Sequence, residues 1–254
     1  VTVETEGGER ISASYCIAAD GPASLTGREL LGADGELGAG IEADVVRRPE
    51  LAGDTALFHF GSVRNGYSWV FPREDTVSVG AGVFRSTRTR LKPEVRKLAR
   101  EWGDGADLSV LGRPLPVSLA RRRRRHGRVL FAGDAAGLVD PLLGEGIRHA
   151  LASGRLAGRC IAAGRIAAYE RLVHREIASD LIWAGRWAHV FHAFPRISYE
   201  LGVKNPIFIE DFLEVLAGRM SYLQFLLRSP WYSATTLLRP SHRYPRSGWR
   251  PAER

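Results

Sequence analysis

The sequence predicts a mixed α/β fold, α+β overall, and three observations support this. Apolar and polar residues alternate through short segments between residues 1 and 84, which is typical of β-strands. Residues 128–163 pass from a short apolar strand through a glycine-rich turn into a long helix rich in alanine. Residues 167–238 are largely helical in pattern, with breaks near Pro195, Asn205-Pro206 and Ser229-Pro230.

The chain is expected to begin with a β-hairpin. Residues 1–5 and 11–15 flank a turn that contains Gly7-Gly8, and the second arm continues into an apolar strand, residues 16–19. Glycine adopts the left-handed conformations that tight hairpin turns require. The strand ends at Asp20-Gly21-Pro22, and residues 28–31 are predicted to form a short helix.

Residues 41–84 are predicted to form antiparallel strands, at 56–60, 67–71 and 76–84. Tyr67, Trp69 and Phe71 stand two apart, so a strand projects all three onto one face. Ser68 and Val70 then lie on the other face. Further along, the pattern predicts a helix over residues 93–102 and a loop or edge strand, broken by two prolines, over residues 112–120.

Composition indicates a soluble globular protein without a metal site. The 254 residues are 44% hydrophobic and 25% charged, which suffices for a substantial core. No stretch approaches the roughly 20 apolar residues of a membrane span, and the start does not resemble a signal peptide, so a cytoplasmic location is expected. Cys16 and Cys160 are too few for a disulfide framework, and His189 and His192 lack a third ligand.

The positive charge of the chain favours anionic partners. The net charge is +8, and it comes from arginine because the only lysines are Lys92, Lys97 and Lys204. The run Arg121 to Arg125 is either a solvated face or a dock for an anionic lipid, a prenyl diphosphate or the NADPH phosphate. Nucleic acid is not expected as a partner, because the chain has no recognisable reader motif.

The segment from Gly127 to Leu156 carries the strongest chemical signal. A buried strand delivers Asp134 to a turn in which Gly133 and Ala135 keep the backbone accessible to a bulky ligand. A carboxylate at that position accepts hydrogen bonds from sugar-like hydroxyls. Downstream, Gly144-Glu145-Gly146 opens the long helix, whose free amides favour an electron-rich group.

This segment resembles the second FAD-contacting motif of the geranylgeranyl reductase and aromatic hydroxylase superfamily of flavoproteins. By that resemblance Asp134 would bind the ribityl chain of FAD, with Gly133 and Ala135 beside it. The isoalloxazine ring would lie along the residues that open the helix, which are Pro141, Gly144, Glu145, Gly146 and Ile147. Preorganised amides there would stabilise the negative charge of a reduced flavin.

Two further elements fit the same superfamily. Asp20-Gly21 resembles its Asp-Gly motif, although the arginine that usually follows comes later here, as Arg28. By this resemblance Asp20 and Gly21 would lie near the cofactor. The element from Tyr67 to Pro72 resembles the Y-x-W-x-F-P sequence of geranylgeranyl reductases. Tyr67, Trp69, Phe71 and Pro72 would therefore line the path of an isoprenoid chain, or alternatively form an ordinary core strand.

The resemblance implies a particular domain organisation. Residues 1–35 and 121–165 would be portions of a three-layer FAD-binding domain, present only in part. Residues 36–120 would form an inserted antiparallel β-sheet domain for the substrate, and residues 166–238 a helical carboxy-terminal region. Residues 239–254 carry three prolines and no apolar periodicity, which favours a disordered tail.

One expected motif is missing. Flavoproteins of this class bind the ADP half of FAD with an amino-terminal G-x-G-x-x-G, which this sequence lacks, and the glycines of residues 35–40 follow no suitable strand. Val1 already stands inside a strand-like alternation, as in a sequence entered midway. We therefore expect weak FAD binding and little activity from these 254 residues alone.

The function implied by the resemblance is reduction of the carbon-carbon double bonds of a polyprenyl chain, in an isoprenoid or prenyl lipid. FAD would be the cofactor, and NAD(P)H or reduced ferredoxin the electron donor. The protein would work in the cytoplasm or at the periphery of a membrane. A flavin-dependent monooxygenase or halogenase would share Asp20 and Asp134, and an inactive fragment that binds lipid or a partner is the third alternative. The catalytic proton donor is not identified. Glu145 is the nearest candidate, and the role of His149 stays open.

Overall fold

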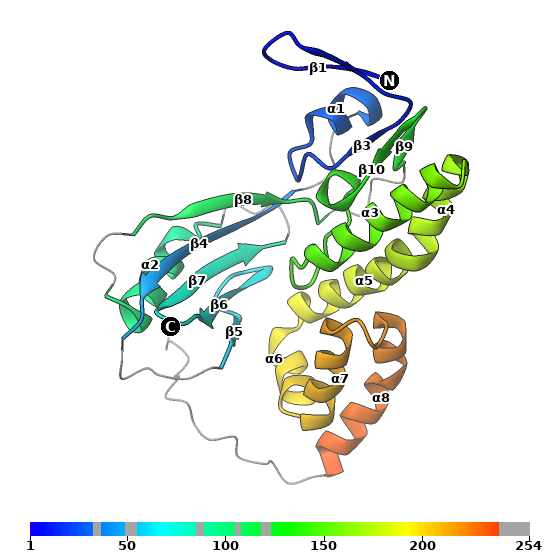
Figure 1. Cartoon of the computed structure of the whole chain (residues 1–254). Helices are drawn as coiled ribbons and strands as arrows, with labels where there is room; N and C mark the ends of the chain where they lie inside the picture. The colour runs from blue at the N-terminus through cyan, green and yellow to red at the C-terminus, as the bar shows by residue number, and fades with distance from the viewer. Residues whose placement is uncertain (33–36, 49–54, 85–88, 105–107, 118–122, 239–254) are drawn as a thin grey trace. The chain divides into compact units, whose positions relative to one another are not determined.

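The computed structural model describes residues 1–32, 37–48, 55–84, 89–104, 108–117 and 123–238. The chain divides into two compact units, Val1–Ala193 and Phe194–Arg254. The predicted helical region of residues 166–238 is thus shared between the two units. The predicted tail, residues 239–254, lies outside the described residues (Figure 1).

The amino-terminal hairpin is confirmed. β1 (Thr2–Glu4) and β2 (Arg10–Ser12) pair antiparallel, with Thr2 opposite Ser12. Gly8 in the turn has a φ of 79°, which is the left-handed conformation that glycine was expected to supply. The apolar strand that follows is β3 (Cys16–Ala18), and the predicted short helix is α1 (Leu25–Leu31).

A small three-stranded sheet joins the two predicted portions of the cofactor domain. β3 pairs in parallel with β10 (Val129–Phe131), and β10 pairs antiparallel with β9 (Arg125–His126). Beside it, toward the lower right in Figure 1, lie α3 (Ile147–Ala162), α4 (Tyr169–Val173) and α5 (Ser179–Ala193). Their apolar side chains form one core with β10, and the hydroxyl of the fully buried Tyr169 donates to the Phe131 carbonyl at 2.5 Å.

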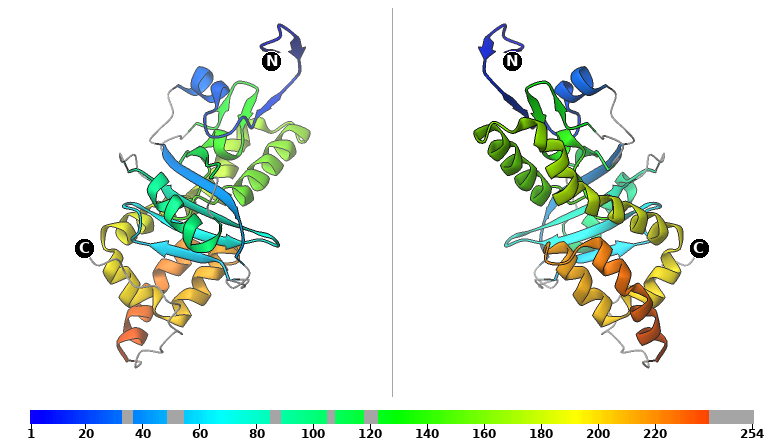
Figure 2. Two further views of the ribbon diagram at one scale, coloured as in Figure 1. Left: turned by 90° about the vertical axis from the view of Figure 1, so that its left-hand side faces the viewer. Right: turned by 90° about the vertical axis from the view of Figure 1, so that its right-hand side faces the viewer.

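The predicted β region is a five-stranded antiparallel sheet in the order β5-β6-β7-β4-β8. Its strands are β4 (Gly38–Val46), β5 (Leu57–Phe60), β6 (Gly66–Pro72), β7 (Thr76–Val83) and β8 (Leu111–Leu115). β8 contains Pro114 and lies at the edge, where a missing amide donor is tolerated, so the edge-strand alternative is confirmed for residues 112–115, while residues 118–120 lie outside the described residues. The predicted helix is α2 (Lys92–Trp102), which covers one face of this sheet (Figure 2).

The second unit consists of helices. They are α6 (Pro195–Ser198), a π-helical turn at Tyr199–Val203, α7 (Pro206–Leu216) and α8 (Tyr222–Leu238). The predicted break at Pro206 is confirmed, because the Asn205 side chain caps α7 by accepting from the Ile207 amide at 3.0 Å.

The predicted break at Pro230 is wrong, since α8 runs through it. Proline inside a helix removes one backbone hydrogen bond and clashes with the preceding turn. Residues on either side compensate, because both pair with Asp211 of α7. Arg228 donates to its carboxylate at 2.8 Å, and the Tyr232 hydroxyl donates at 2.5 Å. Tertiary contacts therefore outweigh the local preference of proline.

No helix among the described residues is long and apolar enough to cross a membrane. The same residues contain no group of three or more histidine, cysteine or acidic side chains placed to hold a metal ion.

Candidate functional site

The parallel pairing of β3 and β10 brings the two predicted acidic residues to one edge of the small sheet. Ala18 lies opposite Phe131, and the Ala132 amide donates to the Ala18 carbonyl at 3.0 Å. Parallel strands present their carboxyl ends at the same edge, which is where α/β folds bind ligands. Asp20 follows β3 and Asp134 follows β10, so the chain reaches this edge twice.

The turn that carries Asp134 rests directly on α3. Residues Gly133–Ala136 form a single 3₁₀ turn, and the Gly133 amide donates to the Ser153 hydroxyl at 2.9 Å. Gly133 has a φ of 58°, and a Cβ there would lie 2.9 Å from the Ala150 side chain. Ala135 is fully buried. Small residues are therefore required here by the close approach of the helix as well as by the turn.

The Asp134 side chain is half-buried and lies against the start of α3. A Cβ at Gly146 would lie only 3.0 Å from its Oδ1 atom. Burial raises the pKa of this carboxyl above its ordinary value. Within the described part of the chain, no hydrogen bond or ion pair reaches the carboxylate, so its oxygens are available to a ligand.

Asp140 shapes the loop between the turn and α3. It is 2% exposed, and its Oδ1 atom accepts from the Leu142 amide at 2.7 Å and the Leu143 amide at 3.0 Å. Its backbone amide donates to the Glu145 carbonyl at 2.8 Å, and its carbonyl accepts from the Gly144 amide at 2.8 Å. Sequence reasoning missed this residue, although Asp-Pro is a recognised start of such turns.

The loop so formed positions the predicted ring-contacting residues. Pro141 is buried, and Gly144 has a φ of 72°, a conformation that favours glycine. Gly146 is the first residue of the helix cap, and Ile147 is 78% exposed. The backbone of this loop and the exposed Ile147 side chain therefore lie at the amino-terminal end of the 16-residue helix α3.

Glu145 and His149 form a close pair at that helix start. Oε1 of Glu145 accepts from the Arg148 amide at 2.8 Å, and Oε2 lies 3.6 Å from Nδ1 of His149. His149 is 5% exposed, and its Nδ1 atom makes no hydrogen bond within the described residues. Burial lowers the pKa of His149, only partly offset by Glu145, which favours the neutral imidazole.

Asp20 has a different role from Asp134 in the structure. Its carboxylate accepts from the Ser24 hydroxyl at 2.7 Å and from the Thr26 amide at 3.1 Å, and so orders the start of α1. Partial burial acts to raise the pKa of Asp20, but these hydrogen bonds outweigh it and lower the pKa. Gly21 has a φ of 84°, which the turn after β3 requires.

The aromatic face of the five-stranded sheet is as predicted. Tyr67, Trp69 and Phe71 of β6 form ring contacts with one another along one face, with Trp69 and Phe71 stacked at 6.1 Å. Phe58 and Phe60 of the neighbouring strand join them, opposite Trp69 and Tyr67. Trp69, Phe71 and Pro72 are only partly buried, which differs from an ordinary core strand.

The opposite face of β6 packs beneath α2. The Ser68 hydroxyl donates to Glu94 of α2 at 3.0 Å, and Val70 belongs to the core that this helix covers. The two faces of the strand therefore have separate roles, one in the core and one partly open.

Glycines in β7 make room for the indole of Trp69. Gly80 lies directly opposite Trp69, and a Cβ at Gly80 would overlap the indole ring. At Gly82 a Cβ would lie 3.5 Å from the same ring. The indole therefore lies flat over the neighbouring strand and widens the aromatic face.

The aromatic face and the loop before α3 are in direct contact. The Tyr67 hydroxyl donates to the Leu143 carbonyl at 2.5 Å, and its ring stacks on Phe84 at 5.5 Å. A Cβ at Gly144 would lie 3.0 Å from the Phe84 ring. Burial, and to a lesser extent Asp140, raises the pKa of Tyr67, so the phenol remains a donor. The residues predicted to bind the substrate therefore lie next to the loop predicted to contact the cofactor.

The arginine run is not simply a solvated face. Arg121 and Arg122 lie outside the described residues, but Arg124 is only 4% exposed. Its Nε donates to the Ala136 carbonyl at 3.2 Å, and its backbone amide donates to Glu170 at 2.7 Å. Burial lowers the pKa of Arg124, with Tyr169 and Glu170 acting in the opposite direction. Arg124 thus braces the turn that carries Asp134, while Arg123 is exposed.

Comparison with known proteins identifies homologues among prenyl-chain reductases, although no family model matches the chain. It is 35% identical over 168 residues to digeranylgeranylglycerophospholipid reductase 2 of Methanosphaera stadtmanae, a match that covers 58% of this chain and 40% of that protein. It is 39% identical over 101 residues to the geranylgeranyl diphosphate reductase of Synechocystis, covering 38% of this chain and 25% of that protein. The chain therefore matches less than half the length of these relatives.

The fold is shared with solved flavoprotein structures. A geranylgeranyl bacteriochlorophyll reductase-like protein from Thermoplasma acidophilum superposes with a TM-score of 0.62 at 21% identity, over 75% of this chain and 56% of that one. HpxO of Klebsiella pneumoniae, in a variant complexed with FAD, gives 0.55 at 17% identity, over 93% and 64%. At these identities the comparison establishes the architecture alone.

Proposed function

We propose, from the premise that this chain is homologous to geranylgeranyl reductases, that it forms the flavin-ring and substrate portion of an FAD-dependent reductase of prenyl double bonds. One observation carries the proposal, namely the junction of the aromatic face with the loop before α3. The Tyr67 hydroxyl bonds to Leu143, and Phe84 contacts Gly144. A chain that binds along the aromatic side chains would meet a ring held by that loop.

The residues at the sheet edge suit the ribityl and ring portions of FAD. Asp134 would accept hydrogen bonds from the ribityl hydroxyls, beside the bare backbone of Gly133 and Ala135. The loop from Pro141 to Gly144, and the helix start at Glu145, Gly146 and Ile147, would lie along the ring. Asp20 and Gly21 would border the cofactor from β3. When bound and reduced by the electron donor, FAD would supply a hydride to one alkene carbon.

The other alkene carbon needs a proton, because an isolated double bond gains both. Glu145 and His149 are the titratable side chains at the start of α3, and His149 is held neutral by burial. We propose Glu145 as the residue that would pass the proton to the alkene, since it is half-buried, with the neutral imidazole of His149 within 3.6 Å to position its carboxyl group.

The aromatic face would bind the hydrocarbon chain. Burying one CH₂ group contributes about 0.8 kcal/mol, so a long prenyl chain gains much from an extended apolar wall. Tyr67, Trp69, Phe71 and Pro72 would supply that wall. Electrons would come from NAD(P)H or reduced ferredoxin, and the substrate would be an isoprenoid or prenyl lipid, at a membrane periphery or in the cytoplasm.

The activity is tested by incubating the chain with FAD, dithionite as the electron source, and prenyl substrates of increasing length under anaerobic conditions. Because FAD binding and activity from these 254 residues alone are expected to be weak, we expect mass spectrometry to show a low yield of product, with a gain of one H₂ for each double bond reduced. Oxygenated product formed in air with NAD(P)H would instead favour the monooxygenase alternative. Binding of prenyl lipid without any reduction, with FAD shown to be bound, would favour the inactive lipid-binding alternative.

The role of the aromatic face is tested by Gly80→Ala. The new methyl group would displace the Trp69 indole, and we expect affinity for a fluorescent prenyl probe, measured by anisotropy, to fall about tenfold. Gly112→Ala in the same sheet is the matched control, because a Cβ there would make only ordinary contacts, with the Ile41 side chain at 3.4 Å and the Gly40 carbonyl oxygen at 4.0 Å. Equal probe affinity in the two variants would show that Trp69 does not contact the chain.

A further inference from the structure

The outward side of α2 is a second chemically distinct surface. Its inward side, with Val95, Leu98 and Ala99, is buried against the five-stranded sheet. Its outward side carries exposed cations, and one more, Arg90, lies just before the helix. Together we call them the basic face: Arg90, Lys92, Arg96, Lys97 and Arg100. Two of the three lysines of the whole chain are among them.

The basic face is not neutralised by acidic neighbours. Glu94 is turned toward the sheet, where it accepts from Ser68, and Glu101 is the one acidic side chain beside the cations in the described part of α2. No ion pair involves a cation of the basic face within the described residues. Some exposed arginines elsewhere are paired, as in Arg73 with Asp44 and Arg219 with Glu214, whereas others in the described part of the chain, such as Arg155, are not.

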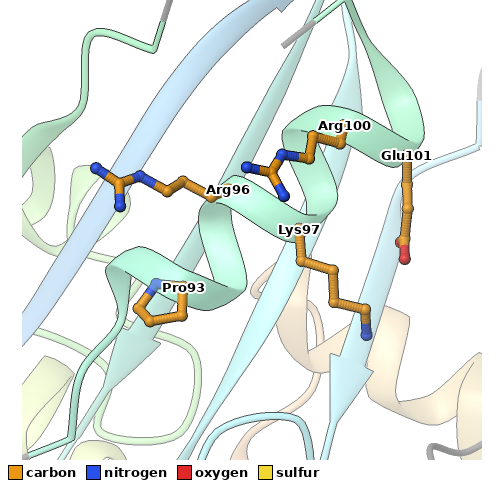
Figure 3. A pocket seen from close by; sticks show the side chains of 5 residues that line it. All are labelled: Pro93, Arg96, Lys97, Arg100 and Glu101. Carbon is orange, nitrogen blue, oxygen red and sulfur yellow. The ribbon is translucent and has the colours of Figure 1, made fainter.

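The cations surround a shallow hollow rather than an enclosed cavity. Pro93, Arg96, Lys97, Arg100 and Glu101 line a space of about 450 Å³ on the outward side of the helix. Figure 3 shows Arg96 and Arg100 extending from α2 toward one side, and Lys97 extending in a different direction. Arg48 adds a further cation at the helix end, where it donates to the Gly103 and Arg100 carbonyls at 3.0 and 2.9 Å.

We propose that the basic face of α2 binds the surface of an anionic phospholipid bilayer. Clustered exposed lysine and arginine side chains bind such surfaces through many weak contacts with lipid phosphates, which an open, spread array of cations suits. Nucleic acid fits less well, because the one aromatic side chain of α2, Trp102, packs against the core and is not displayed beside the cations for base stacking. α2 covers the face of β6 that carries Ser68 and Val70, so the aromatic face of the sheet stays clear of the contact.

This surface is independent of the proposed function, because none of its residues belongs to the site around Asp134. If the substrate is a membrane lipid, attachment through α2 would keep the protein where that substrate is. The attachment itself requires neither FAD nor catalysis, so its test can fail or succeed on its own.

The test is co-sedimentation of the full chain with vesicles of phosphatidylcholine, alone or mixed with phosphatidylglycerol. We expect binding to the mixed vesicles only, weakening as salt is raised. In the variant Arg96→Glu/Lys97→Glu/Arg100→Glu, we expect binding to the mixed vesicles to weaken about 100-fold or more.

A matched control separates the basic face from net charge. Arg155→Glu/Arg159→Glu/Arg165→Glu changes the net charge by the same amount at exposed positions of α3 and just beyond it. This control should retain vesicle binding, and circular dichroism should show both variants folded. Equal loss in both variants, no binding by the unaltered chain, or tighter α2-dependent binding to duplex DNA than to vesicles would each overturn the proposal.

Discussion

Asp134→Ala is expected to weaken FAD binding about 100-fold without unfolding the chain. Hydrogen bonds to a charged acceptor contribute about 1.5–3 kcal/mol each, and the ribityl chain would lose the acceptor altogether. Asp134→Asn keeps a neutral acceptor of the same shape, so its affinity should lie between the two. Flavin fluorescence quenching in an equilibrium titration measures all three.

The same carboxylate is expected to carry a small stability cost that binding offsets. The folded-state pKa of Asp134 is raised by burial, so the ionised form destabilises the fold at pH values above that pKa, and the cost vanishes below the ordinary pKa. Asp134→Asn should therefore unfold at an equal or higher temperature than the unaltered chain at neutral pH, with the difference fading in acid.

A control fixes the interpretation of the Asp134 variants. Asp75→Asn changes an exposed carboxylate in the turn between β6 and β7 and should leave FAD binding unchanged. Unaltered FAD affinity in Asp134→Ala would remove this residue from the cofactor site. A folded variant with lost binding would separate the binding role from a structural one.

Gly66→Ala is expected to cost about 3 kcal/mol or more of the free energy of unfolding. A Cβ there would overlap the Gly82 carbonyl and lie 3.0 Å from the Val83 Cα, and these backbone atoms are held in the β6-β7 pairing. Overpacking of this kind typically costs about 1–3 kcal/mol, and more when backbone must move. Urea unfolding followed by circular dichroism measures the change.

A glycine-to-alanine substitution in α3 should instead increase the free energy of unfolding. At Gly154 a Cβ would meet nothing within 4 Å, so Gly154→Ala should stabilise the helix by about 0.5–1 kcal/mol. If Gly66→Ala were as well tolerated as Gly154→Ala, the close approach of β6 to β7 would be refuted.

Periodicity of two or of about four residues predicted most of the elements. The alternation in residues 67–71 assigned Tyr67 and Trp69 to one face and Ser68 to the other, and the register with β5 and β7 confirms it. Such patterns depend only on the geometry of a single strand. The turn at Gly133 was likewise predictable, since its small residues follow an apolar strand directly.

These local patterns could not predict contacts between segments that are far apart in the sequence. Arg124 stands in a run of arginines, and nothing local distinguishes the one whose guanidinium is buried beneath Ala136. Pro230 has a strong local preference that Asp211, on another helix, overrides. The two predicted groups of site residues were each identified from local motifs, but their contact through Tyr67 depends on tertiary packing alone.

The hydrogen bond from Tyr67 to Leu143 links the aromatic face of the sheet to the loop before α3 through one side chain. Its ring is part of the aromatic face, which we propose as the wall for the hydrocarbon chain, and its hydroxyl bonds to the loop that Asp140 shapes. Any ligand that reorients the ring must also act on the loop, and thermodynamic linkage makes that effect reciprocal. Binding of a ligand at the proposed hydrocarbon wall and binding of a ligand at the loop are therefore expected to change each other's affinity. The Tyr67 hydroxyl group would transmit this effect.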